Sequence, residues 1–141
     1  MINVSESKTE SVSQSRINKR ILIIDDNWTD LKLMQKALKE IGYNEIYLVD
    51  RGILGIRKAI SLKPHLIILD LHLPDINGVL AYRIIKAGKS RTTKMIIVSG
   101  VKSSSLLEIL DQMNDEGVIP DQFVEKSCDF SWLQKMVNSI I

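Results

Sequence analysis

The sequence predicts a three-layer α/β fold with a five-stranded parallel sheet, because short aliphatic runs alternate five times with longer amphipathic stretches. The aliphatic runs are rich in Ile, Val and Leu and mostly do not alternate with polar residues. This composition is typical of strands that are buried on both faces of a parallel sheet. The length of 141 residues suits one domain.

The aliphatic runs predict five strands. They are Arg20–Ile24, Glu45–Val49, His65–Leu69, Lys94–Val98 and Asp121–Glu125. In a parallel sheet the carboxyl ends of all strands lie at one edge, and ligands of open α/β sheets bind at that edge.

The stretches that follow the strands predict five helices, each with apolar residues at helical spacing. In chain order, these apolar positions are Leu31, Met34, Leu38 and Ile41; Ile53, Ile56, Ala59 and Ile60; Val79, Leu80, Ile84 and Ala87; Leu106, Leu107, Ile109, Leu110 and Met113; and Trp132, Leu133, Met136, Val137 and Ile140. Gly42 is the predicted stop of the first helix. The second helix is expected to end before Pro64, because proline disfavours a helical residue in front of it.

Residues 1–18 are predicted to be a polar tail that is disordered or partly helical against a neighbour, and residues 19–141 the folded domain. The tail carries five serines, mixed charges and no hydrophobic periodicity. Such a segment cannot bury enough apolar surface to offset the entropy lost on ordering.

The composition excludes several classes of protein. Hydrophobic residues make up 45% of the chain and charged residues 26%, as in ordinary globular proteins. The net charge of +2 gives no reason to expect direct binding to nucleic acid or to a membrane. The single cysteine suits a reducing compartment, and no apolar run approaches the roughly 20 residues of a membrane span. We therefore expect a soluble, cytoplasmic protein.

Polar residues stand where four of the predicted strands end. They are Asp25 and Asp26, Asp70, Ser99 and Gly100, and Glu125 and Lys126. If the strand order is 2-1-3-4-5, the first and third strands are neighbours, and Asp25, Asp26 and Asp70 converge at the sheet edge.

Three converging carboxylates repel one another unless a cation compensates their charge. Mg²⁺ prefers oxygen ligands and commonly binds one or two carboxylates together with phosphate oxygens. Lys126 would add a mobile positive charge, and Ser99 a hydroxyl group. This set indicates phosphoryl chemistry, with Asp70 as the nucleophile that takes the phosphoryl group.

Four motifs at the strand ends carry a resemblance to a known family. They are "ILIIDD", "LIILDLHLPDING", "IIVSG" and "FVEK", in this order. From about residue 18 onward, the chain resembles a response-regulator receiver domain of two-component signalling. The resemblance implies a flavodoxin-like (βα)5 three-layer sandwich with the parallel sheet order 2-1-3-4-5.

The resemblance also implies a role for each residue of the site. Asp70 would be the phosphoacceptor, and Ser99 and Lys126 would contact the phosphoryl oxygens. Asp26 and Asp70 would bind Mg²⁺ directly, Asp25 mainly through water, and the backbone carbonyl of His72 would complete the protein ligands. Phe123 stands where the family has its aromatic switch residue.

The implied function is a signalling switch. The phosphoryl donor would be a histidine kinase or a phosphotransfer protein. Phosphorylation would alter the face formed by the fourth helix, the fifth strand and the fifth helix, for a downstream protein that the sequence does not identify or for a homodimer. The protein would catalyse its own phosphotransfer and dephosphorylation and would not be an enzyme for an outside substrate.

Two features depart from the family pattern. Ser127 follows the lysine where the family usually has a cis proline, and a cis bond before a non-proline residue costs about 3–4 kcal/mol. The segment "MNDEGVIPD" is expected to add a loop before the fifth strand and to remodel the switch face.

Three other functions fit parts of the pattern. The chain could be a receiver-like interaction scaffold that is not phosphorylated. A Mg-dependent aspartyl phosphatase of the haloacid-dehalogenase type needs a second acid two residues after the nucleophile, where this chain has His72. A flavin-binding module needs a phosphate-binding first loop, and "DDNWTD" would repel phosphate unless a metal is bound.

Overall fold

The fold is a five-stranded parallel sheet between two layers of helices. The computed structural model describes residues 14–88, 92–100, 103–115, 120–126 and 130–141. The strands are β1 Arg20–Ile24, β2 Glu45–Val49, β3 Leu66–Asp70, β4 Lys94–Ser99 and β5 Gln122–Glu125. All neighbouring strands pair in parallel, in the order β2-β1-β3-β4-β5. The predicted fold class and strand order are therefore confirmed.

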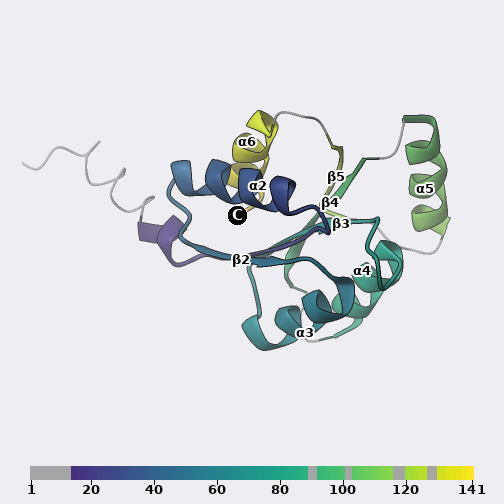
Figure 1. Ribbon diagram of the computed structural model, residues 1–141, viewed down its shortest axis with the longest axis horizontal. Coiled ribbons are helices and arrows are strands. Elements are labelled where there is room, and N and C mark those ends of the chain that lie inside the picture. Colours follow the sequence, from purple (N-terminus) through teal and green to yellow (C-terminus); the bar gives the residue numbers. More distant parts are fainter. Residues whose placement is uncertain (1–13, 89–91, 101–102, 116–119, 127–129) are drawn as a thin grey trace, which may run out of the picture.

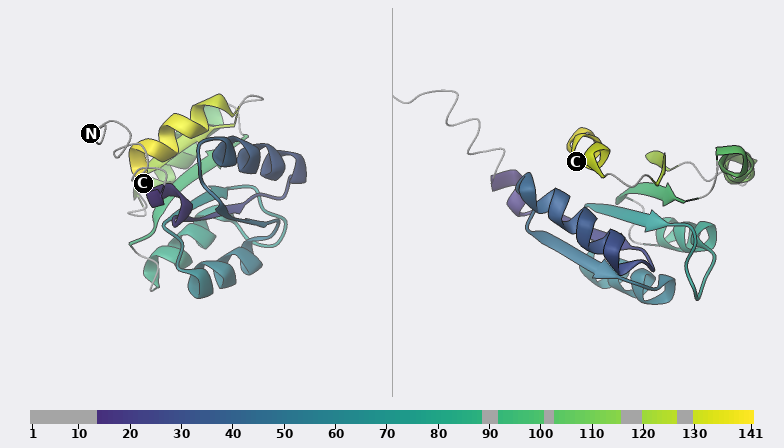
Figure 2. Two further views of the ribbon diagram at one scale, coloured as in Figure 1. Left: turned by 90° about the vertical axis from the view of Figure 1, so that its left-hand side faces the viewer. Right: turned by 45° about the horizontal axis from the view of Figure 1, so that its top comes forward.

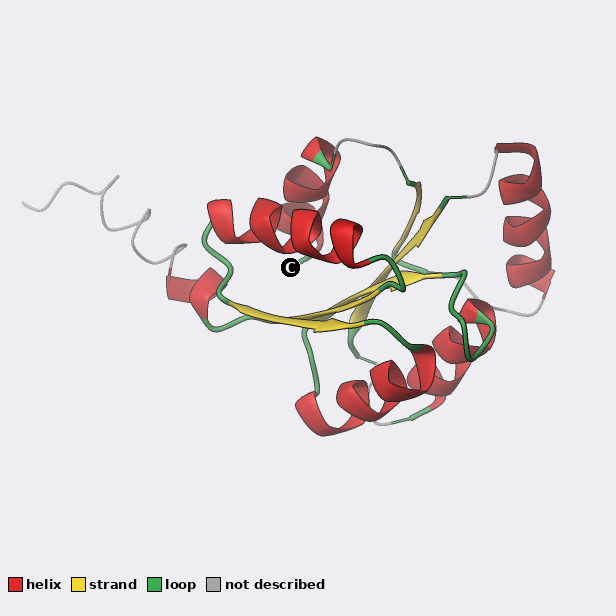
Figure 3. Ribbon diagram, viewed as in Figure 1, coloured by secondary structure: helices red, strands yellow, loops and turns green. Residues whose placement is uncertain are grey.

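Five helices follow the strands. They are α2 Trp28–Glu40, α3 Gly52–Leu62, α4 Gly78–Ala87, α5 Ser103–Asp115 and α6 Ser131–Ile140. Helices α2 and α6 lie on one side of the sheet and α3 and α4 on the other, while α5 lies at the outer margin (Figures 1 and 3). Within the described ranges, no helix has both the length and the apolar character that crossing a bilayer requires.

Each face of the sheet packs against its own hydrophobic core. Successive residues of a strand point to opposite faces. Ile21 and Ile23 of β1 therefore belong to the core under α2 and α6, whereas Leu22 and Ile24 belong to the core under α3 and α4. All five residues of β3 are buried, which explains why the strand reads as an unbroken aliphatic run ending in Asp70.

The boundaries of two strands bear directly on the site. The structure places Asp70 inside β3 and Ser99 inside β4, where the predicted strands ended one residue earlier. His65 and Asp121, which were predicted as first residues of strands, lie just outside them. The side chains of Asp70 and Ser99 are thus held by strand backbone and not by loops.

Residues next to helix α2 determine where it begins and ends. The side chain of Asn27 accepts a hydrogen bond from the backbone N–H of Asp30 and caps the amino end of α2. The last residue of the helix is Glu40, Ile41 is its C-cap, and Gly42 follows with φ of 103°, a left-handed conformation that glycine adopts without strain. The predicted stop at Gly42 is confirmed.

The predicted apolar face of α4 is wrong at three positions. Leu80 and Ile84 are 46% and 42% exposed, Ala87 is exposed as well, and the residues that face the sheet are Ala81, Tyr82 and Ile85. The helix is thus turned about its axis relative to the predicted orientation. Gly78 fixes the observed orientation, because a Cβ atom there would lie 2.4 Å from the Cα of Leu71. The backbone of α4 therefore meets the backbone that follows Asp70 directly.

Helix α3 is also turned about its axis relative to the predicted orientation. Ile53 and Ile60, which were predicted on its apolar face, are exposed, and small residues face the sheet. A Cβ atom on Gly55 would lie 2.5 Å from Cδ1 of Ile24. The close approach of α3 to β1 therefore requires glycine at this position, and it turns the larger side chains outward.

Part of the predicted tail contacts the fold. Residues 14–17 form a helical turn, and Figure 2 shows this turn at the start of β1. The guanidinium group of Arg16 donates a hydrogen bond to the carbonyl of Ile41 at 2.9 Å and lies over the ring of Tyr43. Residues 1–13 lie outside the described residues, so their predicted disorder stays a prediction.

Candidate functional site

Three carboxylates meet at the carboxyl edge of the sheet. Asp25 and Asp26 follow β1, and Asp70 ends the neighbouring strand β3. One oxygen from each of the three lies within 4.8 Å of the others. Asp25 and Asp70 are 1% and 5% exposed, whereas Asp26 is exposed to solvent. The predicted convergence of these three residues is therefore observed.

Backbone hydrogen bonds fix the Asp25 side chain. The N–H of Asp25 donates to the carbonyl of Val49, and the N–H of Asn27 donates to Asp25 Oδ1 at 2.9 Å. The other oxygen, Oδ2, is buried, and the ammonium group of Lys126 lies 2.7 Å from it as its ion-pair partner. This oxygen therefore faces a cation already, and a metal ion bound here would share it with the lysine.

Asp70 is held in a similar manner. The N–H of His72 donates to Asp70 Oδ1 at 3.0 Å, and Lys126 Nζ lies 3.3 Å from Oδ2. The carboxylate is therefore oriented by the loop that follows it and faces a positive charge. A carboxylate fixed in this way can act as a nucleophile.

Lys126 is the centre of the charge network. Its ammonium group lies 2.7 Å from Asp25, 2.8 Å from Asp30 and 3.3 Å from Asp70. Its backbone N–H donates to the carbonyl of Ser99 at 2.6 Å, which ties the end of β5 to the end of β4. The predicted grouping of the lysine with the acidic residues is observed.

The contact of Asp30 with Lys126 was not predicted from the sequence. This residue lies in the first turn of α2, and its carboxylate contacts the lysine from the helix side of the site. An aspartate shortly after an acidic pair is equally typical of a helix amino terminus, so the sequence carried no distinct signal for this contact.

At this site, burial disfavours the charged forms of Asp25 and Lys126, whereas hydrogen bonds and opposite charges favour them. Burial raises the pKa of the Asp25 carboxyl to about 6, although hydrogen bonds from Lys126 and from the Asn27 N–H favour its charged form. Burial alone would lower the pKa of Lys126, but the bonds to Asp25 and Asp30 and the charge of Asp70 outweigh it and raise that pKa. The lysine therefore stays charged and compensates part of the negative charge.

The carboxylates suit a hard divalent cation. The site offers oxygens of Asp25, Asp26 and Asp70 that lie within 4.8 Å of one another. Mg²⁺ prefers such oxygen ligands and retains several waters, which an exposed residue such as Asp26 would permit. The residues present therefore fit magnesium.

The remaining predicted residues lie on β4, on β5 and in the loop after β3. Ser99 is fully buried at the end of β4, and His72 is exposed in the loop after β3, where its backbone bridges to Asn77. Phe123 is half-buried in β5 and packs against the core under α3 and α4. Ser127, the peptide bond before it and residues 116–119 of the predicted loop lie outside the described residues.

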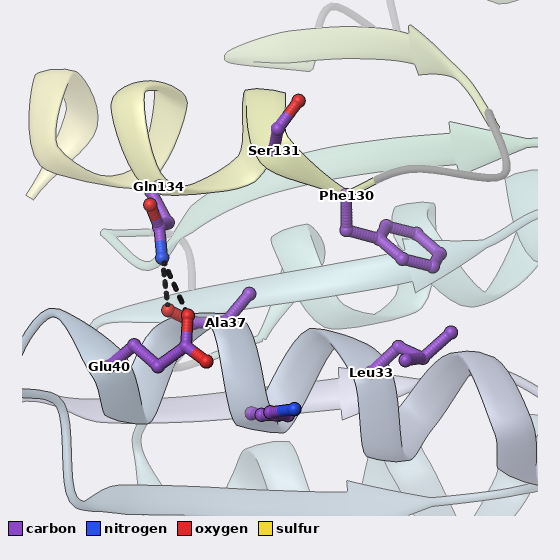
Figure 4. A pocket seen from close by; sticks show the side chains of 7 residues that line it. Leu33, Ala37, Glu40, Phe130, Ser131 and Gln134 are labelled. Carbon is purple, nitrogen blue, oxygen red and sulfur yellow. Dashed lines mark hydrogen bonds between the residues drawn. The ribbon is translucent and has the colours of Figure 1, made fainter.

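A separate groove of about 500 Å³ lies between α2 and α6. Leu33 on α2 and Phe130 beside α6 line it, and Gln134 donates hydrogen bonds to Ala37 and Glu40 (Figure 4). None of the acidic residues of the sheet edge lines it. The groove therefore contributes no chemistry to the carboxylate site.

The chain matches the model of a known protein family. A family model described as the response regulator receiver domain matches residues 21–138. This range contains all ten of the strands and helices named above except the first residue of β1 and the last two residues of α6.

Solved structures give the same fold. A CheY-like response regulator receiver domain protein from Methanospirillum hungatei JF-1 has a TM-score of 0.74 and 26% identity, with 86% of this chain and 91% of that chain covered. The response regulator protein TrrA from Thermotoga maritima, in complex with Mg²⁺–BeF, has a TM-score of 0.73 and 28% identity, with 87% of this chain and 99% of that chain covered.

Curated relatives are longer than this chain. The alkaline phosphatase synthesis transcriptional regulatory protein PhoP of Bacillus subtilis is 40% identical over 63 residues, which cover 45% of this chain and 26% of that protein. The probable transcriptional regulatory protein SilR of Salmonella typhimurium is 28% identical over 123 residues, which cover 86% of this chain and 54% of that protein. The matches span about a quarter and about half of the length of these two relatives.

Proposed function

The chain belongs to the response regulator receiver domain family of two-component signalling, and on this premise we propose that it is a signalling switch in which Asp70 accepts a phosphoryl group. The observation that carries the proposal is the convergence of Asp25, Asp26 and Asp70, two of which, Asp25 and Asp70, pair with the ammonium group of Lys126.

The proposed transfer is a displacement at phosphorus. A carboxylate oxygen of Asp70 forms a bond to phosphorus while the bond between phosphorus and the donor breaks. With a phosphohistidine donor from a histidine kinase or a phosphotransfer protein, the leaving imidazole nitrogen takes up a proton. The hydrogen bond from the His72 N–H holds the other oxygen of Asp70 and so leaves Oδ2 facing Lys126.

Asp25, Asp26 and Asp70 would hold Mg²⁺, with the backbone carbonyl of His72 as the further protein ligand. When bound, the ion neutralises negative charge on the transferring phosphoryl oxygens. The short distances between oxygens of the three carboxylates, all within 4.8 Å, support this assignment.

Lys126 and Ser99 would bind the phosphoryl oxygens. The lysine stays charged and already lies 3.3 Å from Asp70, and Ser99 ends the strand next to β3. The backbone bond from the Lys126 N–H to the Ser99 carbonyl couples the two strand ends. A movement of either residue toward the phosphoryl group would therefore displace the other.

The output surface of the proposal is the face of α5, β5 and α6. Phe123 lies in β5 and would rotate inward when Ser99 moves toward the phosphoryl group. A downstream protein or a second copy of the chain would read this change. The proposal involves no direct contact with nucleic acid or with a membrane, and it places the chain in the cytoplasm, where a single free cysteine stays reduced.

The proposed catalysis is confined to the chain itself. Water attacks phosphorus, the bond to Asp70 breaks, and inorganic phosphate leaves while the carboxylate is restored. A Mg-dependent phosphatase for outside substrates is less well supported, because the position two residues after Asp70 carries His72 and not an acid.

Intact mass spectrometry tests the proposal against the alternative of an unphosphorylated scaffold. The protein is incubated with Mg²⁺ and acetyl phosphate, beside Asp70→Asn and a sample with a chelator. One phosphoryl adduct in the wild type and none in either control is the expected result. A folded wild-type protein that takes no phosphoryl group from acetyl phosphate or from a phosphotransfer protein would support the scaffold.

A further inference from the structure

The shortest contacts of Lys126 are not with the proposed phosphoacceptor. Its ammonium group lies 2.7 Å from Asp25 and 2.8 Å from Asp30, but 3.3 Å from Asp70. In this state of the protein, the lysine is thus drawn toward β1 and α2 and away from the end of β3.

Asp30 differs from the other carboxylates in its position. It lies in the first turn of α2, and its N–H is bound by the side chain of Asn27, so the cap fixes the backbone that carries it. The described acidic cluster that fits a metal comprises Asp25, Asp26 and Asp70 and does not include Asp30. A bound metal ion would therefore compete with Lys126 for the carboxylate of Asp25. It would leave the ion pair between Asp30 and Lys126 intact.

We propose that Asp30 is a positioning residue that holds Lys126 on the α2 side of the site and competes with the phosphoryl group on Asp70 for its ammonium group. This inference rests on the proposed function. A lysine ammonium is a compact charge on a flexible stem, so nearby anions compete for it directly. Its side chain is 16% exposed and that of Asp30 21%, so solvent screens the pair only partly.

The competition has a defined consequence for the switch. Breaking the contact with Asp30 is part of the cost of bringing Lys126 to the phosphoryl oxygens. Asp30 would therefore favour the unphosphorylated state and lower the affinity of the site for a phosphoryl group. Removal of its charge would free the lysine and favour the phosphorylated state.

The variant Asp30→Asn tests this with beryllofluoride, a stable mimic of the phosphoryl group, at saturating Mg²⁺. We expect the affinity for beryllofluoride to rise by roughly threefold to tenfold, the effect of one partly buried ion pair. The affinity for Mg²⁺ alone should not rise, because Asp30 lies outside the carboxylate cluster. Asp30→Glu, which keeps the charge, should stay close to the wild type.

A general effect of charge must be separated from an effect through the lysine. Asp50→Asn is the matched control, because Asp50 binds Trp28 and Arg51 near the same sheet edge, whereas the described ion pairs of Lys126 are with Asp25, Asp30 and Asp70. It should change the beryllofluoride affinity by less than about twofold. In a Lys126→Met background, Asp30→Asn should no longer raise that affinity.

A metal-free measurement gives an independent readout of the same contact. In the presence of a chelator, urea unfolding of the single variants Asp30→Asn and Lys126→Met and of the double variant forms a double-mutant cycle. The double variant should be more stable than the sum of the single effects predicts, because each single change removes the same ion pair.

The outcomes separate this inference from the proposed function. If the wild type binds neither beryllofluoride nor a phosphoryl group, both are overturned. If the wild type binds beryllofluoride and Asp30→Asn binds it equally or more weakly, only the role of Asp30 is overturned. The same holds if the gain persists in the Lys126→Met background or if Asp50→Asn produces an equal gain.

Discussion

Asp75 caps helix α3 from a different segment of the chain. Its two carboxylate oxygens accept hydrogen bonds from the N–H groups of Gly52 and Ile53, at 2.8 and 2.9 Å. Arg51, the residue at the N-cap position, provides no side-chain bond of its own. The loop that follows Asp70 therefore supplies the cap and ties the proposed phosphorylation site to α3.

Asp75→Ala should lower the thermal midpoint of unfolding, because two N–H groups at the start of α3 lose their acceptor. The exposed residue Asp111 on α5 provides the matched control, Asp111→Ala, which should leave the midpoint almost unchanged. Equal effects of the two substitutions would show that the cap does not stabilise the fold.

The same cap predicts a dependence of stability on pH. The bond from the Ile53 N–H, with that from Gly52, lowers the pKa of Asp75 below its ordinary value of 3.8. The stabilisation is therefore complete above the ordinary pKa and is lost as the pH falls through the lower, folded-state pKa. Denaturant unfolding between pH 2 and pH 5 should show a smaller loss of stability toward acid in Asp75→Asn than in the wild type.

The environment of His65, at the amino edge of the sheet, predicts a second dependence of folding stability on pH. Its Nδ1 accepts a hydrogen bond from the Arg20 N–H at 3.0 Å. Burial, with the charges of Arg20 and Lys19, lowers the pKa of His65 below its ordinary value of 6.5. Stability should therefore fall as the pH drops below 6.5 and through the folded-state pKa, because the unfolded chain binds the proton more tightly. His65→Asn, which keeps an acceptor, should lose this part of the slope.

Gly78→Ala should destabilise the fold by about 1–3 kcal/mol, because the added Cβ must displace backbone and not a flexible side chain. The nearest atoms to that Cβ are Cα, O and C of Leu71, at 2.4, 2.7 and 2.8 Å. Gly88→Ala is the control, since its Cβ would lie 3.7 Å from its nearest neighbours. Because Leu71 follows Asp70, the variant should also slow phosphoryl uptake; equal stability of the two variants would contradict the close approach.

Lys126→Met should destabilise the metal-free protein by about 2 kcal/mol at pH 8, because it leaves Asp25, Asp30 and Asp70 without their shared cation. The loss should be smaller at pH 5, below the pKa of about 6 of Asp25, because a protonated carboxyl needs no cation. Lys94→Met, which removes an exposed lysine 3.8 Å from Asp121, should cost less than about 1 kcal/mol. A loss that does not depend on pH would contradict the role of charge.

The sequence predicted the sheet well because its signals are local. Buried parallel strands need unbroken aliphatic runs, and β1 and β2 were predicted with their observed boundaries. The carboxylates at the ends of β1 and β3 converge because the strand order makes these strands neighbours. Strand order, supported by the family resemblance, was therefore sufficient to assemble the site.

The features that were not predicted depend on contacts between distant segments. The rotation of α4 is set by the approach of Gly78 to the backbone of Leu71, and hydrophobic periodicity alone does not show it. The contact between Asp30 and Lys126 joins residues far apart in the chain, and so does the cap of α3 by Asp75. Each of these residues also fits an ordinary local role, which is why the sequence gives no separate signal.

The central claim is that Asp70 itself receives the phosphoryl group. The most direct test is to phosphorylate the protein with acetyl phosphate and Mg²⁺, reduce it with borohydride, and map the peptides by mass spectrometry. Borohydride converts an aspartyl phosphate to homoserine and so marks the acceptor permanently. We expect homoserine at position 70 alone, and none when Mg²⁺ is withheld. Homoserine at Asp25 or Asp26, with position 70 unchanged, would contradict it.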